Sequence, residues 1–197
     1  MQKPSHKKRY DHGNLYAQAS SRGVFSVRRK VAKESYSAIE DLYDILHPEI
    51  TNAAELSAIK SLGVTVVGFS RFDERHCGAG PRTASISEKI CSTSKPLEVG
   101  IGKLALFGSS LKARLALNLV SEELKAEANE FETLFAAMNF PLKPDYNGVE
   151  FTPHCSLALI FRDRLGHFTD NTTMNRLNLN KDSALPTAAS IILEPAR

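Results

Sequence analysis

One short apolar segment, residues 151–159, reads FTPHCSLAL and carries a histidine and a hydroxyl two residues apart. Its length and apolar character predict a β-strand. Alternate side chains of a strand point the same way, so His154 and Ser156 share one face, while Cys155 and Leu157 take the other. An imidazole titrates near neutrality and a hydroxyl can hold a phosphoryl oxygen, so the pair suits chemistry on phosphate esters. A lone histidine on a strand can equally be structural, and spacing alone leaves both interpretations open.

A second apolar segment repeats part of this pattern. Residues 63–71 can be laid on residues 154–162 without a gap, which predicts corresponding strands of a duplicated unit. Each copy would carry a hydroxyl inward and an arginine near its exit. The matched positions are Thr65 with Ser156, Arg71 with Arg162, and Gly63 with His154.

Hydrophobic periodicity places helices and further strands around these two segments. Apolar residues three and four apart from Glu34 to Leu46 predict an amphipathic helix that ends before Pro48. A shorter helix is expected over 53–62, with Asn52 as its N-cap and Gly63 as the left-handed residue after its end. The remaining expectations are a strand over 23–27, a central strand over 64–69, a hairpin through 97–119, a long helix capped by Ser121, and an edge strand within 188–193.

This order of elements favours an α+β fold with antiparallel sheets around a cleft. Helices and strands alternate too irregularly for a doubly wound parallel sheet, and neither a phosphate-binding glycine loop nor a serine nucleophile elbow is present. With 197 residues, of which 42% are hydrophobic, the chain can bury one core without disulfide or metal support. We therefore expect a single domain over 13–197.

The charge of the chain is concentrated at its beginning. Residues 1–33 hold nine Lys and Arg against one Asp, a net +8, which leaves 16 minus 21, or −5, for the remainder. Residues 1–12 are expected to form a basic, flexible tail, either a contact with nucleic acid or a solvated terminus. Three cysteines without Cys-x-x-Cys spacing or a leader favour a reduced, cytoplasmic setting, and no apolar run could cross a membrane.

The two matched strands resemble the two-histidine phosphoesterase superfamily, the group of 2′-5′ RNA ligase-like proteins and cyclic phosphodiesterases. Its signature is a pair of His-x-Thr/Ser-apolar motifs on facing strands, one from each half of a pseudo-symmetric fold. The resemblance is best from about Lys95 to Arg164. It implies a duplicated unit with antiparallel sheets lining a central cleft, helices outside, and acid–base catalysis on RNA ends or on cyclic or 2′-5′-linked nucleotides. It implies no metal and no cofactor, with His154 as one imidazole and Ser156 and Thr65 as donors to the phosphate.

The first motif departs from the family pattern, because Gly63 stands where the second imidazole belongs. General acid or base help is worth about a hundred- to ten-thousandfold, so an active enzyme would draw its second group from outside the motif. The alternative is a catalytically impaired nucleotide- or RNA-binding module of the same fold. A third interpretation, an interaction scaffold, applies if Ser156 and Thr65 lie in separate places. Further candidates are His47, His76 and His12 for the imidazole, and Arg162 and Arg71 near the strand exits.

Overall fold

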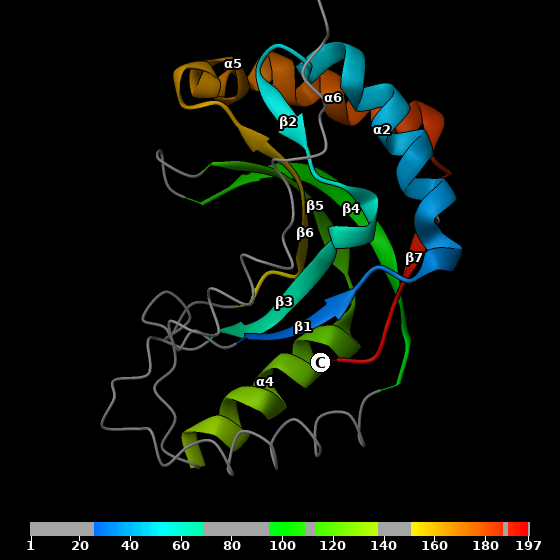
Figure 1. Ribbon diagram of the computed structural model, residues 1–197, viewed down its shortest axis with the longest axis vertical. Helices are drawn as coiled ribbons and strands as arrows, with labels where there is room; N and C mark the ends of the chain where they lie inside the picture. Colours follow the sequence, from blue (N-terminus) through cyan, green and yellow to red (C-terminus); the bar gives the residue numbers. More distant parts are fainter. Residues whose placement is uncertain (1–25, 69–94, 109–112, 138–150, 187–188, 197) are drawn as a thin grey trace, which may run out of the picture.

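The strands form two antiparallel sheets, seen in a computed structural model that describes residues 26–68, 95–108, 113–137, 151–186 and 189–196. The smaller sheet pairs β1 with β3, and the larger has the order β2-β6-β5-β4-β7 (Figure 1). The bounds are β1 Ser26–Lys30, β2 Ala54–Leu56, β3 Gly63–Gly68, β4 Leu97–Phe107, β5 Arg114–Val120, β6 His154–Ile160 and β7 Ser190–Leu193.

The two sheets join into one curled half-barrel. On one side the chain after β1 meets β7, where Val31 bridges Leu193 and the Glu194 amide donates to the Lys30 carbonyl at 2.7 Å. On the other side β3 lies beside β6, where the backbone of Gly63 hydrogen-bonds the thiol of Cys155. The fold class is therefore α+β with curled antiparallel sheets, as predicted.

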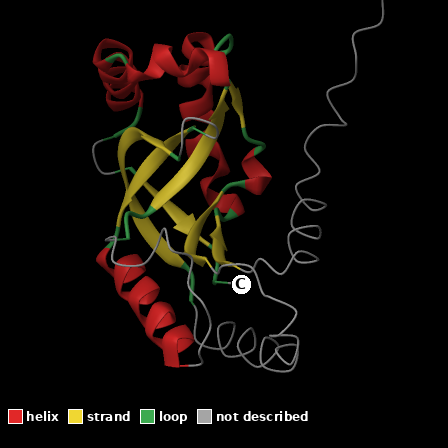
Figure 2. Ribbon diagram, turned by 90° about the vertical axis from the view of Figure 1, so that its left-hand side faces the viewer, coloured by secondary structure: helices red, strands yellow, loops and turns green. Residues whose placement is uncertain are grey.

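Helices cover both ends of the strand layer. α2 and α6 lie side by side at one end, near α5, and α4 lies at the other (Figures 1 and 2). None of the helices within the described ranges is long and apolar enough to span a membrane. The bounds are α2 Tyr36–Ile50, α4 Glu122–Ala137, α5 Leu165–Thr169 and α6 Asn171–Ala184, with 3-10 turns η2 Lys33–Ser35, η3 Ile59–Ser61 and η6 Arg162–Arg164.

The helix α4 shows how local sequence sets an element and its packing. The hydroxyl of Ser121 accepts a hydrogen bond from the Leu124 amide at 3.1 Å, which caps the first turn as predicted. Its buried side chains recur at steps of three or four and face the sheet: Leu124, Ala128, Phe131 and Phe135.

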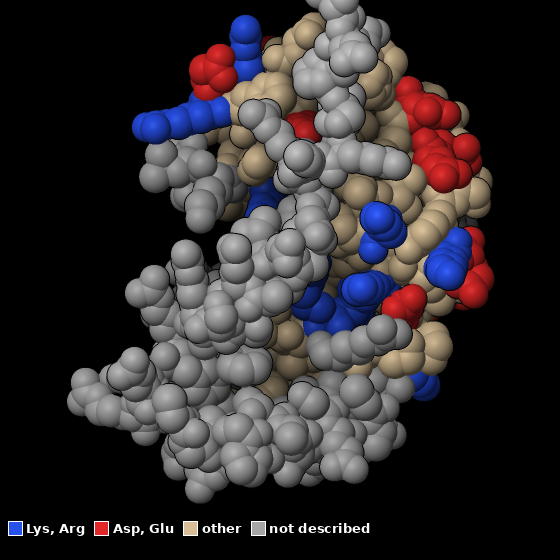
Figure 3. Space-filling model, viewed as in Figure 1, with Lys and Arg blue, Asp and Glu red and all other residues tan. Residues whose placement is uncertain are grey.

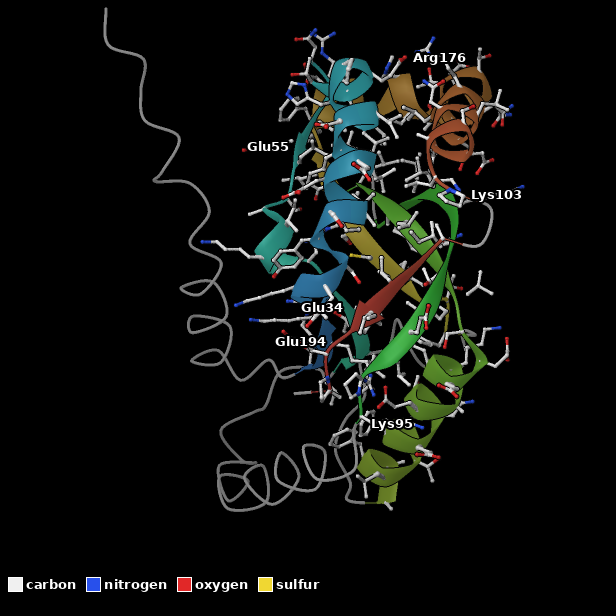
Figure 4. The ribbon with its side chains drawn as sticks, turned by 90° about the vertical axis from the view of Figure 1, so that its right-hand side faces the viewer. Glu34, Glu55, Lys95, Lys103, Arg176 and Glu194 are labelled. Atoms are coloured by element: carbon white, nitrogen blue, oxygen red, sulfur yellow. The ribbon has the colours of Figure 1, made fainter. Side chains whose placement is uncertain are left out.

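A buried arginine ties α4 to both sheets. The guanidinium of Arg29 is 1% exposed and donates to both carboxylate oxygens of Glu127, at 2.6 and 2.5 Å. It also donates to the carbonyls of Lys95, at 2.7 Å, and Glu194, at 2.8 Å. Figure 4 shows Lys95 and Glu194 toward the α4 end of the strands. One side chain of β1 therefore holds α4, the segment entering β4 and the segment leaving β7.

The first helix runs further than its sequence predicted. Pro48 was expected to end it, but α2 continues to Ile50 with Pro48 inside its last turn. Proline removes one helical hydrogen bond. The helix persists because Ile50 is buried in the core and because Glu49 forms an ion pair with Arg176 of α6 at 2.8 Å.

The helix expected over 53–62 is wrong. This stretch holds the short strand β2 and the turn η3, because Ala54–Leu56 pairs with Ala158–Ile160 of β6. Pairing with a distant strand outweighs the local capping signals. Gly63 consequently does not close a helix, and it opens β3 instead.

Two strand expectations also change. Arg28 to Lys30 lie within β1 rather than beyond a strand over 23–27, of which residues 23–25 fall outside the described ranges. The strand over 64–69 is not central, because β3 pairs only with β1 among the described strands. It is apolar because α4 packs against it. The hairpin β4–β5, the strand β6 and the edge strand β7 are confirmed, whereas the polar sequence over 169–182 proves to be mostly helical.

Candidate functional site

A β-bulge in β6 decides which side chains share a face with His154. In β5, Asn118 pairs with His154 and Ala116 pairs with Ser156. The next residue of β5, Leu115, pairs with Ala158 and not with Leu157. Leu157 is therefore one extra residue, and the alternation of side chains reverses after it. In consequence Leu159, 42% exposed, and Phe161, 39% exposed, continue the face of His154 and Ser156. We call this surface the His154 face.

The bulge is held by hydrogen bonds to the carbonyl of Leu157. The Ser57 amide donates to it at 2.7 Å, and the hydroxyl of Tyr43 lies 3.2 Å from it and 2.8 Å from the Ser57 carbonyl. Burial raises the pKa of Tyr43, so this hydroxyl remains a donor at neutral pH. Tyr43 of α2 thus holds the backbone of Leu157, the position at which the side chains of β6 change face.

The imidazole of His154 is held in one orientation. Its Nδ1 lies 2.9 Å from the Thr152 carbonyl, which can only accept, so the neutral ring carries its proton on Nδ1 and leaves Nε2 as an acceptor. The ring of Phe107 stacks on it, with centroids 3.9 Å apart and planes 10° apart. Burial lowers the pKa of His154, helped by the charge of Arg114 and opposed by the Thr152 hydrogen bond. The ring is therefore a neutral proton acceptor at pH 7.

Small side chains lie beside this stacked pair. Ala105 of β4 pairs with Ala116 of β5, which in turn pairs with Ser156. These small side chains allow the ring of Phe107 to cross β5 and reach His154, beside the half-buried Ser156. Asn118, directly opposite His154, has a buried Oδ1 with no hydrogen-bond partner within the described residues. A ligand or water that donates there would remove the cost of that unpaired oxygen.

β3, the strand of Thr65, lies next to β6 at Cys155, whose buried side chain points away from the His154 face. Thr65 pairs with Arg28 across the small sheet, and both are half-buried. The charge of Arg28 and the backbone of Gly63 both reach the buried thiol of Cys155. The strands of Thr65 and Ser156 are therefore neighbours, although no hydrogen bond between these two hydroxyls occurs in the structure described. Figure 3 shows Lys and Arg side chains gathered over β1, and Asp and Glu over α2.

The position of the missing histidine is sterically closed. A Cβ built on Gly63 would overlap the carbonyl oxygen of Arg29 and approach its carbonyl carbon and the Cα of Lys30 to 3.2 Å. These are backbone atoms of β1, which cannot rotate away. Glycine is thus required here by the close approach of two strands.

The other candidate residues lie elsewhere. His47 is exposed in the last turn of α2, which leads toward Ala54 and its partner Ile160, at the opposite end of β6 from His154. Arg162 is exposed in η6, just beyond that end. His76, His12 and Arg71 fall outside the described residues, as does the basic tail. Across the ranges that the structure covers, no group of three or more His, Cys, Asp or Glu is placed to hold a metal ion.

Comparison with known proteins places this arrangement in a known fold. Neither a protein-family model nor a curated protein matches the chain. Usb1 of Kluyveromyces marxianus matches with a TM-score of 0.59 and 12% identity over 87% of this chain and 91% of that one. The structure of the same protein with uridine monophosphate matches with a TM-score of 0.54 and 13% identity, over 89% of this chain and 99% of that one. TT0787 of Thermus thermophilus matches with a TM-score of 0.50 and 15% identity, over 70% of this chain and 73% of that one. Both proteins belong to the two-histidine phosphoesterase superfamily. This chain has the two-histidine phosphoesterase fold.

Sequence reasoning found the motif strands of the two-histidine fold but missed two side chains beside His154. Phe107 and Arg114 pair across the β4–β5 hairpin, and Phe107 reaches over to stack on the imidazole. Their order in the sequence gives no sign of this, because it depends on how far the hairpin curls. The available signal was their place on either side of the hairpin turn, which makes them cross-strand neighbours.

Proposed function

We propose that the protein acts on the phosphate-bearing ends of RNA, or on cyclic or 2′-5′-linked nucleotides. His154 is the proton-transfer group, and the hydroxyls of Ser156 and Thr65 hold the phosphate. The observation that carries this proposal is the imidazole itself. It is neutral, clamped between Phe107 and the Thr152 carbonyl, and has Nε2 open on the same face as Ser156.

The chemistry follows from that open nitrogen. Nε2 takes the proton of the attacking oxygen, a water or a ribose hydroxyl, while the new P–O bond forms. The bond from phosphorus to the leaving oxygen then breaks, and that oxygen takes a proton from solvent or from a second acid. The hydroxyl donors stabilise the negative charge on the phosphoryl oxygens during both steps. All of this requires only groups of the protein, the substrate and water.

A second candidate function is recognition without turnover. The closure of Gly63 supports it, because no side chain from that position can protonate the leaving oxygen. In this case the same face binds a nucleotide or an RNA end and releases it unchanged. The two functions share a ligand and differ in whether a covalent bond is broken.

Hydrolysis assays separate these functions. The purified protein is incubated with EDTA and either nucleoside 2′,3′-cyclic phosphates or 2′-5′ dinucleotides, beside a His154→Ala variant. The matched control is His167→Gln, which changes an exposed histidine of α5. Turnover that falls about a hundredfold or more in His154→Ala and not in the control supports the enzyme.

Binding measurements cover the remaining cases. Absence of turnover, with nucleotide binding that Ser156→Ala weakens, supports the recognition module. The proposal is overturned if the wild-type protein neither hydrolyses nor binds these ligands. It is also overturned if His154→Ala and Ser156→Ala both hydrolyse and bind them as the wild type does.

A further inference from the structure

Arg114 is a cation on the His154 face to which the proposed function gives no role. It opens β5, is exposed, and pairs with Phe107 on one side and Leu159 on the other. Along β5 it shares a face with Ala116 and Asn118, the partners of Ser156 and His154. The register alone therefore directs its side chain toward the face that carries the imidazole.

The distance from Arg114 to Ser156 is within reach of an arginine. The two residues are diagonal neighbours across the β5–β6 pair, because Ala116 faces Ser156 two residues further along β5. Diagonal neighbours are about 7–8 Å apart, which long side chains span. The methyl group of Ala116 is all that lies between them on β5. The ring of Phe107 crosses β5 on this same face to reach His154, so it borders the space between the guanidinium and the hydroxyl.

Two independent features place Arg114 near the imidazole as well. Phe107, its cross-strand partner, stacks on the ring of His154. The positive charge of Arg114 also acts on His154, where it contributes to the lowered pKa of the imidazole. A guanidinium, a neutral imidazole and a hydroxyl therefore converge on one face.

The charge of Arg114 has no ion-pair partner among the residues that the structure describes. The acidic residue that faces this part of the sheet is Glu55, which lies on β2 on the far side of Leu159. A guanidinium that presents its fork of N–H donors beside a neutral acceptor and a hydroxyl is suited to a phosphate group.

We propose that Arg114 binds the phosphate of the ligand at the His154 face. The β4–β5 hairpin would thereby supply a positively charged side chain to the phosphate, whereas position 63 of β3 has no room for any side chain. This inference rests on the proposed function and specifies which cation meets the substrate. Arg114 then contacts the two non-bridging phosphate oxygens, Ser156 donates to one of them, and His154 remains neutral to accept a proton.

The test is binding of uridine monophosphate, with uridine as the ligand that lacks the phosphate. We compare the wild type with Arg114→Gln, Arg114→Lys and, as a matched control, Arg176→Gln, an arginine exposed on α6. Loss of a charged hydrogen bond predicts at least about tenfold weaker binding of the monophosphate by Arg114→Gln. We expect a smaller loss in Arg114→Lys, unchanged binding by the control, and unchanged uridine binding in all variants.

A second readout reports on the position of the guanidinium. The pKa of His154, followed by NMR of the imidazole, should rise in Arg114→Gln because a like charge is removed. Monophosphate binding by Arg114→Gln within twofold of the wild type overturns the inference. If His154→Ala and Ser156→Ala still weaken binding in that case, the proposed function stands and only the role of Arg114 fails. If the wild type binds no monophosphate, both fail together.

Discussion

Adding one methyl group at Gly63 should destabilise the protein markedly. The new Cβ would overlap the carbonyl oxygen of Arg29, so β1 or β3 has to move. Overpacking typically costs 1–3 kcal/mol, and because the obstacle is backbone we expect Gly63→Ala to fall near the upper end, at about 3 kcal/mol. For a chain of this size that corresponds to a melting temperature lower by about 6–12 °C.

Gly100→Ala is the matched control for this change. A Cβ at Gly100 would meet the carbonyl oxygen and Cβ of Val120 at 3.5 and 3.6 Å, which is ordinary van der Waals contact. We expect it to change the free energy of unfolding by less than about 1 kcal/mol. Urea and thermal unfolding of both variants measure the difference. Equal stability of Gly63→Ala and Gly100→Ala would refute the claim that β1 closes this position.

The same geometry bears on attempts to rebuild the second motif. Gly63→His places an imidazole at the position that the two-histidine pattern requires, but its Cβ meets the same backbone oxygen. We therefore expect an unstable variant without gain of hydrolysis, rather than a restored enzyme. A stable, more active Gly63→His would show that the strands separate more easily than their packing indicates.

Three further results are expected. Arg29→Met removes a buried guanidinium that donates to Glu127 and to the carbonyls of Lys95 and Glu194, and it should cost about 3 kcal/mol in chemical unfolding. Arg176→Met, at an exposed ion pair, should cost less than about 1 kcal/mol, and similar losses in the two variants would contradict the reasoning. Tyr43→Phe removes the donor at the bulge and should cost about 1 kcal/mol and shift the NMR signals of His154, and unchanged signals would argue against this link. Folding lowers the pKa of His154, so below about pH 6.5 the unfolded state binds more protons than the folded state. The free energy of unfolding should therefore fall as the pH is lowered through this range, and His154→Gln should make its pH dependence less steep.

Local pattern was sufficient where an element depends on its own residues. The hairpin, the helix capped by Ser121 and the strand of His154 were predicted because alternation, capping and turn residues lie within each segment. The same reasoning failed over 53–62, where pairing with β6 overrides helix signals. It also failed at Pro48, where burial of Ile50 and the ion pair of Glu49 hold a helix past a proline.

In the candidate site too, local sequence predicts some features, while others depend on contacts between distant segments. The shared face of His154 and Ser156 follows from strand alternation and is seen in the structure. The reversal after Leu157 could not be predicted, because a bulge depends on how two strands register and on contacts from Ser57 and Tyr43. The sequence predicts Gly63 as the residue that ends a helix, because glycine occurs both at helix ends and where two backbones approach closely, and the sequence does not distinguish these two roles.

The hydrogen bonds of Arg29 join groups that lie far apart along the chain, which bears on when β1 can reach its final position. During translation Arg29 leaves the ribosome long before Glu127 and longer still before Glu194, whose carbonyl lies 165 positions later in the chain. A buried guanidinium without its acceptors is unfavourable by several kcal/mol, so β1 has little reason to settle in its final place early. We therefore expect β1 to be among the last of the described strands to reach its final position.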